Sequence, residues 1–266
     1  MADFFIFGLG YAAGMIAQRL ATAGWSVTAT GSAGNLPFDQ TEAVHTALAR
    51  ASHVLSSVPP DREGGDPVLA RYGDVLGGKW LGYLSSTGVY GDTGGAWVDE
   101  TAPVGTGRRT ARALADSAWL ERGARVFRLP GIYGPGRSAF DRLRAGTAHR
   151  IALPGQVFSR VHVEDIALGV LAAFDAPPGA YNLADDEPCH QNAVIEHAAH
   201  LLRLPHPPLQ TLEEAALSPM ARAFYAENRR VANGKAKRAL GWRPRHPTYR
   251  EGLRAILAAE QSEQAS

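Results

Sequence analysis

The sequence predicts an α/β fold built on a doubly wound parallel sheet, and three observations predict it. Residues 4–7 form a short apolar run that ends in glycine, and apolar residues recur at helical spacing from Met15 onward. Segments of strand type then alternate with segments of helical type along most of the 266 residues. Such alternation is typical of βαβ units, in which ligands bind at the carboxyl ends of parallel strands.

The first strand-to-helix junction carries the pattern G-x-G-x-x-A, formed by Gly8, Gly10 and Ala13 with Gly14 beside it. Gly8 allows the turn, Gly10 lets the backbone approach a phosphate, and Ala13 allows close packing of helix on strand. A tight turn also favours glycine without a ligand, but free N–H groups and the helix dipole at this place favour a pyrophosphate. We therefore predict a Rossmann-type dinucleotide site, with Tyr11 as a further contact.

Residues 24–30 are predicted as a C-cap glycine, Gly24, and a second strand, and the end of that strand bears on the choice of cofactor. NAD-specific sites usually place an acid there for the ribose 2′-hydroxyl, whereas residues 30–32 read Thr-Gly-Ser. A small neutral patch admits a 2′-phosphate, although the expected arginine is missing as well. NADP is therefore slightly favoured over NAD, with Thr30 in the cofactor site.

The third predicted strand, residues 52–57, ends in Ser57 and is followed by Pro59. Proline ends a strand in any case, but the two residues equally suit a loop over a dinucleotide, so both are cofactor-site candidates. Later helices are predicted from apolar spacing and caps at 41–50, 67–76, 109–122, 138–146, 164–173, 234–240 (capped by Asn233) and 249–259. Strands are predicted at 80–85, 125–129 and 179–183, with an extended piece at 150–154. Residues 218–228 are either a lid or a crossing helix.

Composition excludes several classes of partner. Lys and Arg number 27 against 26 Asp and Glu, so a net charge of +1 implies no nucleic-acid or acidic-membrane field. The single cysteine, Cys189, excludes an intrachain disulfide and fits a reducing compartment. The apolar N-terminus carries Asp3 and lacks a basic segment, and no apolar run reaches membrane-spanning length. We expect a cytoplasmic protein, monomeric or homodimeric, with a small-molecule substrate.

Six stretches, in this order, resemble the extended short-chain dehydrogenase/reductase superfamily, the NAD-dependent epimerase/dehydratase group. They are Leu-Ser-Ser-Thr-Gly-Val-Tyr-Gly-Asp (84–92), Val-Asp-Glu-Thr-Ala-Pro (98–103), Arg-Leu-Pro-Gly-Ile-Tyr-Gly-Pro-Gly (128–136), Val-His-Val-Glu-Asp-Ile-Ala (161–167), Tyr-Asn-Leu-Ala-Asp-Asp-Glu (181–187) and Leu-Gly-Trp-Arg-Pro (240–244). The chain is most similar to the short atypical, YeeZ-like members, whose substrates are not generally known. The resemblance implies an NAD(P)-binding Rossmann domain at 1–150, completed by later strands. It also implies a small α/β substrate lobe with C-terminal helices at 151–266.

In that family a serine or threonine, a tyrosine and a lysine four residues beyond it form the active site. Ser86 matches the hydroxyl, and Thr87 is its neighbouring alternative on the substrate side. Arg108 stands at the tyrosine position and Arg112 at the lysine position. Arginine cannot act as an acid or base near neutral pH. Arg112 can still replace the lysine's charge beside the cofactor, and Arg108 is a substrate-site candidate.

Another group must move the proton if hydride chemistry survives. Tyr133 is the first candidate and Tyr90 the second, with Arg108 or Arg112 as the cation that favours the phenolate. A packed ring with a bonded hydroxyl is the alternative for each tyrosine. His162, at the start of a predicted helix, is expected to cap that helix or act as a hinge, with substrate contact as a second role.

No metal site is predicted, because the histidines at 190, 197, 200 and 206 lack a carboxylate or cysteine at compact ligand spacing. The sequence therefore predicts an NAD(P)-dependent oxidoreductase, epimerase or dehydratase for a small hydroxylated or sugar-like substrate. The alternative is a catalytically silent NAD(P)-binding sensor or scaffold. A β-hydroxyacid-dehydrogenase type of enzyme fits less well, because strand signals continue after residue 150.

Overall fold

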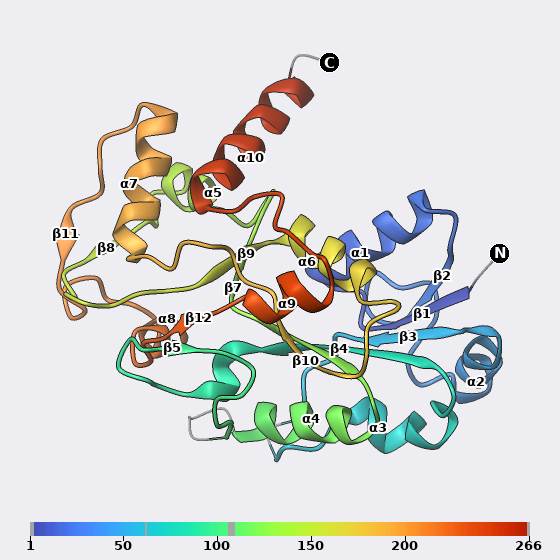
Figure 1. Cartoon of the computed structure of the whole chain (residues 1–266). Coiled ribbons are helices and arrows are strands. Elements are labelled where there is room, and N and C mark those ends of the chain that lie inside the picture. The colour runs from blue at the N-terminus through green and yellow to red at the C-terminus, as the bar shows by residue number, and fades with distance from the viewer. Residues whose placement is uncertain (1–2, 62, 106–109, 265–266) are drawn as a thin grey trace.

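The computed structural model describes residues 3–61, 63–105 and 110–264 of the chain. Within them, the main sheet has six parallel strands in the order β10-β6-β4-β3-β1-β2 (Figure 1). These strands are β1 (Asp3–Phe7), β2 (Ser26–Ala29), β3 (His53–Ser56), β4 (Trp80–Ser86), β6 (Arg125–Leu129) and β10 (Gly179–Asn182). The predicted doubly wound sheet of Rossmann type is confirmed.

Strand β1 is the point at which the winding of the sheet reverses. Strand β2 pairs with one edge of β1, where Phe5 lies opposite Thr28, and β3 pairs with the other, where Phe5 lies opposite Val54. Phe4 through Phe7 are fully covered, as expected for a parallel strand with helices on both faces. The carboxyl ends of β1 and β3 therefore flank the crevice where such sheets bind ligands.

Helices cover both faces of the sheet (Figure 1). One face carries α1 (Tyr11–Thr22), α6 (Val163–Ala172) and α9 (Gly234–Ala239), and the other carries α2 (Thr41–Arg50), α3 (Pro67–Tyr72) and α4 (Thr110–Glu121). Ile16 and Ile166 belong to the core of the first face, and Val44 and Trp119 belong to the core of the second. The two apolar cores fix the sheet and hence the positions of its carboxyl ends.

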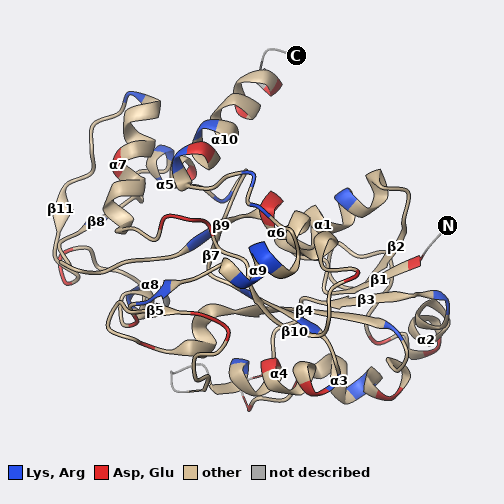
Figure 2. Ribbon diagram, viewed as in Figure 1, with Lys and Arg blue, Asp and Glu red and all other residues tan. Residues whose placement is uncertain are grey.

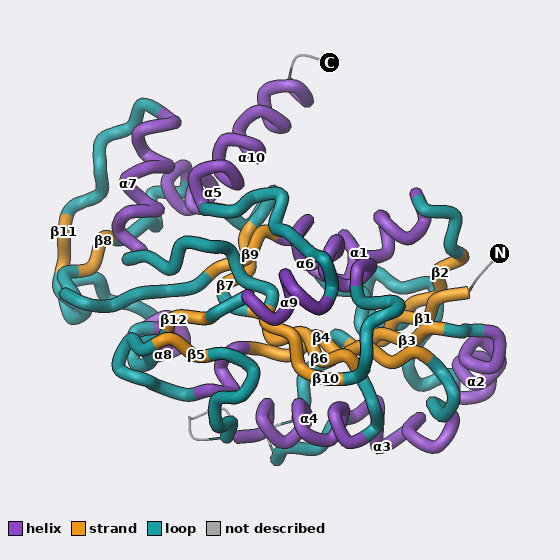
Figure 3. Tube along the Cα trace, viewed as in Figure 1, coloured by secondary structure: helices purple, strands orange, loops and turns teal. Residues whose placement is uncertain are grey.

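A second group of elements lies beside the sheet (Figure 3). Its helices are α5 (Ala139–Arg144), α7 (Gln191–Leu202), α8 (Pro219–Phe224) and α10 (Tyr249–Gln264). Its short parallel pairs are β5 (Trp97–Val98) with β12 (Arg230–Val231), β7 (Gly131–Tyr133) with β9 (Arg160–His162), and β8 (Arg150–Ile151) with β11 (Leu209–Gln210). We call these elements the substrate lobe. The two parts interleave along the chain, because β5 precedes α4 and β6 of the main part, and α6 and β10 return to the main sheet after residue 150.

Some local predictions are wrong in detail. The helix predicted at 67–76 ends at Tyr72 and continues as a 3-10 turn, Gly73–Val75. Strand β7 lies outside the predicted strands, and it forms only through its distant partner β9. Asn233 precedes α9 but does not cap it with its side chain, since its amide donates to the carbonyl of Ala184 (2.8 Å) and to Asp186 (2.6 Å).

Both signs of charge are spread over the sheet, its helices and the substrate lobe (Figure 2). Among the described helices, none combines the length and the apolar character that a membrane crossing requires.

Candidate active site

The turn after β1 is held by residues that end the two neighbouring strands. Gly8 has φ +83°, a conformation that glycine adopts readily, and its N–H donates to Thr30 Oγ1 at 3.2 Å. The Ser57 hydroxyl donates to the carbonyl of Gly8, and the N–H of Leu9 donates to the carbonyl of Thr30 at 2.7 Å. The structure thus joins three predicted cofactor-site residues, Gly8, Thr30 and Ser57. Thr30 is buried, so its hydroxyl supports the turn from inside and does not reach the surface where a cofactor would bind.

The amino end of α1 fits a pyrophosphate. Gly10 is the N-cap residue, no side chain caps the helix there, and the first turn contains no acid. A Cβ at Gly10 would meet no atom within 4 Å, so the backbone is open to a ligand at this point. Ala13 packs in the core beneath the turn, as its small size predicts. Unpaired N–H groups and the positive end of the helix dipole therefore face open space.

Two further cofactor candidates border this turn. The hydroxyl of Tyr11 donates to the carbonyl of Pro135 at 2.9 Å, and the Arg137 guanidinium lies 5.7 Å from the centre of the Tyr11 ring. Tyr11 thereby links the turn to the loop that follows β7. Pro59 is exposed in the loop after β3. Tyr11 and Pro59 are both exposed, so each is accessible to a bound dinucleotide.

The backbone explains why no acid follows β2 at once. Gly31 has φ +110°, and a Cβ there would lie 2.9 Å from the backbone nitrogen of Leu9. A side chain at Gly31 is therefore both strained and obstructed. Ser32, which is exposed, is the nearest position where an acid or a cation can meet the ribose. The preference for NADP remains an expectation from the sequence.

The predicted catalytic hydroxyl lies at the carboxyl edge of the main sheet. Ser86 is the last residue of β4, is partly exposed, and its Oγ accepts from the N–H of Gly88 at 3.1 Å. Thr87, the neighbouring candidate, is buried. Arg108, at the expected tyrosine position, lies outside the described residues.

Arg112 does not provide the cation for the candidate phenol. Its Nη1 donates to the hydroxyl of Tyr83 at 2.8 Å, and burial raises the pKa of Tyr83 to about 12 although Arg112 opposes that shift. The cation beside Tyr90 is Arg128 instead, whose Nη1 donates to the Tyr90 hydroxyl at 3.0 Å. The expectation that Arg112 is the cation beside Tyr90 is therefore wrong. Arg112 bonds to Tyr83 of β4, whereas Tyr90 bonds to Arg128 of β6.

The hydroxyl of Tyr90 is committed to other groups. It accepts from Arg128 and donates to Asn182 Oδ1 at 2.7 Å, and the Arg128 guanidinium lies 5.1 Å from the ring centre. Burial raises the pKa of Tyr90, and the nearby Arg128 charge does not overcome this. The phenol is therefore poorly suited to exchange protons near neutral pH.

A buried ion pair supports this arrangement. Arg128 donates to Asp116 Oδ1 at 2.7 Å and to Oδ2 at 3.1 Å, and the side chains are 4% and 0% exposed. Ser85 donates to Asp116 Oδ2 at 2.6 Å. We did not predict this network, although Arg128 in an apolar strand and Asp116 on a buried helix face together indicate a partner.

Tyr133, the first candidate for proton transfer, points toward α10. Its hydroxyl donates to the carbonyl of Thr248 at 3.5 Å and lies against the backbone at Gly252, where no Cβ can fit. Burial raises its pKa, and the nearby carboxyls of Asp185 and Asp165 add to the rise. The packed-ring interpretation describes Tyr133 in this structure.

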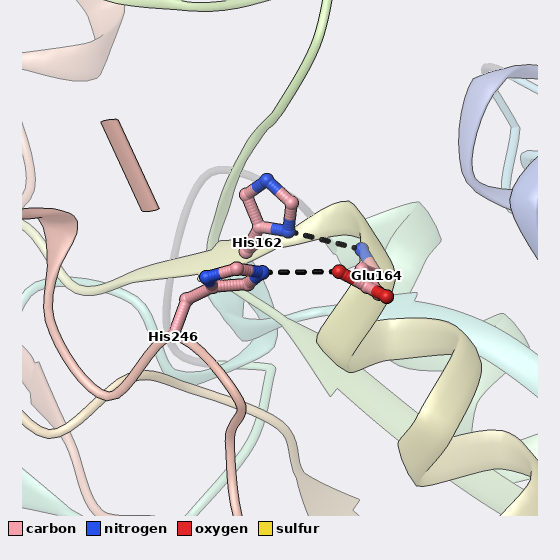
Figure 4. Close-up of side chains that lie close together, drawn as sticks. All are labelled: His162, Glu164 and His246. Atoms are coloured by element: carbon pink, nitrogen blue, oxygen red, sulfur yellow. Dashed lines mark hydrogen bonds and ion pairs between the residues drawn. The ribbon is translucent and has the colours of Figure 1, made fainter. Parts of the chain in front are cut away.

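His162 caps α6 and packs inside a cluster with Glu164 and His246 (Figure 4). Its Nδ1 accepts from the N–H of Glu164 at 3.3 Å, and its ring lies 4.0 Å from the ring of His246. The Nε2 of His246 lies 3.1 Å from Glu164 Oε2. Because only 4% of His162 is exposed, the structure shows the predicted capping role and leaves little surface for substrate contact.

The same cluster brings three possible metal-ligand atoms within 4.8 Å of one another, a juxtaposition that the sequence did not suggest. The Glu164 carboxylate already pairs with Arg19 and Arg245. Burial acts to raise its pKa, but the His246 hydrogen bond and the two guanidiniums outweigh burial and lower it. A divalent cation would lie beside two positive charges, so we interpret the cluster as a clamp between α1, α6 and the C-terminal segment.

The clamp predicts a loss of stability in acid. Burial, together with the His246 charge, lowers the pKa of His162 from 6.5 to about 4. Between these values the unfolded chain binds a proton that the folded chain excludes, so the free energy of unfolding decreases as pH falls through this window. Urea unfolding at about pH 7.5 and about pH 4.5 should show a decrease of up to about 3 kcal/mol from this group.

The control for this effect is His162→Asn, which keeps a capping oxygen but cannot titrate. The variant should lose less stability than the wild type over the same pH interval. An equal loss in both proteins would contradict the assignment of the acid sensitivity to His162.

Comparison with known proteins places the chain in a family. No protein-family model matches it. A functionally unknown conserved protein from Silicibacter pomeroyi is 44% identical, with a TM-score of 0.86 over 97% of this chain and 99% of that chain. The chain belongs to the same family as that protein. Family membership here carries no activity, because the relative is itself described as functionally unknown.

More distant structures define the fold. Human epimerase family protein SDR39U1, solved with NADPH, is 15% identical with a TM-score of 0.75 over 96% of this chain and 99% of that chain. The Thermus thermophilus UDP-glucose 4-epimerase, solved with NAD, is 20% identical with a TM-score of 0.73 over 97% of this chain and 99% of that chain. The chain has the fold of the extended short-chain dehydrogenase/reductases, epimerase/dehydratase group, as predicted.

One curated enzyme also matches in sequence. It is a 3-diazoavenalumate denitrifying reductase from a Streptomyces species, 34% identical over 161 residues, or 54% of this chain. The aligned region makes up 52% of the reductase, so the match spans about half the length of that relative.

Proposed function

We propose that the protein is an NAD(P)-dependent reductase that delivers hydride to a small electron-poor acceptor. The observation that carries the proposal is the uncapped, acid-free amino end of α1 at the point where the winding of the sheet reverses. In this fold Ser86 ends a strand on the same edge of the sheet. A dinucleotide held at Gly10 and an acceptor at Ser86 then share one crevice.

The residues present fit the cofactor. The N–H groups of the first turn of α1 bind the pyrophosphate, while Ser57 fixes the turn and Pro59 borders it. The nicotinamide supplies hydride when bound. Ser86 orients the acceptor through its hydroxyl.

The chain's own proton carriers limit the chemistry. Arg108 and Arg112 replace the phenol and the ammonium of the family pattern, and neither donates a proton near neutral pH. The hydroxyls of Tyr90 and Tyr133 are bonded elsewhere and their pKa values are raised. A ketone needs a proton as its oxygen becomes an alkoxide. An acceptor whose reduction forms no alkoxide needs no proton donor, and acceptors of this kind suit the site.

The Streptomyces relative supports this choice by its name, which describes a denitrifying reduction of a diazo compound. In a reduction of that type hydride forms a C–H bond on the carbon that carries a diazonium group. The C–N bond breaks, its electron pair leaves with the nitrogen, and dinitrogen departs without a proton donor. We propose an acceptor of this class, or an equally cationic one such as an iminium.

The proposed function predicts a pattern of turnover. With 4-deuterated NADPH, arenediazonium or iminium acceptors should gain deuterium faster than aldehydes and ketones do, relative to reactions without protein. Ser86→Ala should lower kcat at least about tenfold, whereas Ser86→Thr, which keeps the hydroxyl, should retain most of it. Tyr90→Phe and Tyr133→Phe should each stay within about threefold of wild type, because neither phenol moves a proton.

Other outcomes separate the alternatives. Faster reduction of carbonyl compounds, with a tenfold loss in one folded Tyr→Phe variant, would contradict the phenol-free mechanism and support a dehydrogenase for a hydroxylated or sugar-like substrate. The second candidate, a silent NAD(P) sensor, is motivated by the replaced pair at Arg108 and Arg112. Tight cofactor binding with no acceptor reduced would favour that sensor.

A further inference from the structure

Helix α5 in the substrate lobe presents an arginine that forms no ion pair within the described part of the chain. On one side of the helix Phe140 is buried, and Arg144 lies 5.6 Å over its ring and pairs with Glu260 of α10 at 2.6 Å. Arg142 stands two residues from Phe140 and two from Arg144, so its side chain leaves the helix on the side opposite to theirs. It is solvent-exposed, and its guanidinium has no acceptor among the described residues.

A second arginine, Arg160 of β9, is buried, and each acceptor that its guanidinium meets among the described residues is neutral. Its guanidinium donates to the carbonyl of Phe158 at 2.9 Å, to the sulfur of Cys189 at 3.2 Å and to Gln191 Oε1 at 3.0 Å. Asp185 lies within electrostatic range of Arg160, and burial raises the pKa of Asp185 to about 8 although Arg160 opposes the shift. Burial thus favours the uncharged form of Asp185, and within the described residues its carboxyl makes no hydrogen bond or ion pair with the Arg160 guanidinium.

Tyr225, just after α8, completes the group. Its ring meets the ring of Phe158 edge-on at 5.5 Å, and its hydroxyl has no acceptor within the part of the chain that the structure describes. Burial raises the pKa of Tyr225, while the charges of Arg142 and Arg160 lower it. Burial and the charge of Arg160 lower the pKa of Arg142, although Tyr225 and Asp141 oppose that shift. The three groups thus lie within electrostatic range, and the surrounding protein partly desolvates Arg142 although its side chain is exposed.

We propose that Arg142, Arg160 and Tyr225 form an anion subsite of the substrate lobe, which binds a carboxylate or phosphate group of the substrate. Two like charges with no bonded acid repel each other until an anion joins them. Arg142 offers the planar donor fork that recognises an oxyanion, and Tyr225 adds a hydroxyl. The Phe158 and Tyr225 rings provide an apolar wall for the carbon skeleton. The inference rests on the proposed function in naming the class of its substrate.

Calorimetric titration of the full chain at neutral pH and low salt tests the subsite. The probes are benzoate, phenyl phosphate and the uncharged benzamide. At least one of the two anions should bind more tightly than benzamide. Whichever of benzoate and phenyl phosphate binds more tightly identifies carboxylate or phosphate as the natural group. Arg142→Gln should weaken that binding at least about tenfold, the loss of a charge-assisted hydrogen bond. Tyr225→Phe should weaken it less.

The matched control is Arg144→Gln, which removes a neighbouring arginine of α5 that is already paired with Glu260. It should bind the anion as the wild type does. Equal binding of the anions and benzamide, no detectable anion binding, or the same weakening in both arginine variants would overturn the proposal. NADPH binding is measured separately in Arg142→Gln. Anion binding that depends on Arg142 in a protein that ignores NADPH would retain the subsite and remove the proposed function.

Discussion

Arg128→Met is expected to cost about 3–5 kcal/mol of the free energy of unfolding, the largest stability effect that the structure predicts. The substitution leaves the Asp116 carboxylate buried without its bidentate partner and frees the Tyr90 hydroxyl from its donor. Urea unfolding followed by circular dichroism measures the change. Arg50→Met is the control, because the Arg50–Asp3 pair has a 74% exposed arginine side chain and should contribute less than about 1 kcal/mol.

A second variant keeps this prediction testable if Arg128→Met does not fold. Arg128→Met combined with Asp116→Leu removes both charges, and it should recover part of the lost stability because no lone charge stays buried. A loss in Arg128→Met as small as in Arg50→Met would contradict the buried ion pair. So would a double variant less stable than the single one.

Gly10→Glu is expected to give the largest functional effect, loss of dinucleotide binding. Gly10 has φ −96° and open space where a Cβ would stand, so a glutamate side chain fits at this position without strain. Its carboxylate would then occupy the amino end of α1 and repel a pyrophosphate. Calorimetric titration with NADPH should show an affinity at least about a hundredfold weaker.

Gly10→Gln separates shape from charge at this position. It has the same size as Gly10→Glu without the negative charge, so it should weaken NADPH binding by a smaller factor. Thermal unfolding should show both variants folded. Unchanged NADPH affinity in both would contradict the placement of the cofactor at this turn.

The parts of the fold that the sequence predicts well depend on local signals. The helix at 41–50 matches α2, and the strands at 4–7 and 125–129 match β1 and β6 within one residue, because apolar period and flanking glycines mark them. Strand β7 was missed because it is three residues long and forms through pairing with β9 far along the chain. Short pairs of this kind leave little periodic signal in a single sequence.

The candidate site shows the same division. The turn at Gly8 and Gly10 is local, and the structure gives these residues the predicted geometry. The partners of the tyrosines are not local. Tyr90 meets Asn182 across 92 residues, and Tyr133 meets Thr248 across 115 residues. A sequence pattern predicts that a tyrosine follows a strand, but the packing of distant elements decides where its hydroxyl points.

The measurement that tests the account most directly is the thermal unfolding of the wild-type chain with NADPH and NADH at millimolar concentration. A ligand that binds only the folded chain stabilises it by RT ln(1 + [L]/Kd), about 2.7 kcal/mol at a hundredfold excess over Kd. We expect a rise of several degrees in the melting temperature of the wild type, larger with NADPH, and little or no rise in Gly10→Glu. An unchanged melting temperature of the wild type with both cofactors would contradict it.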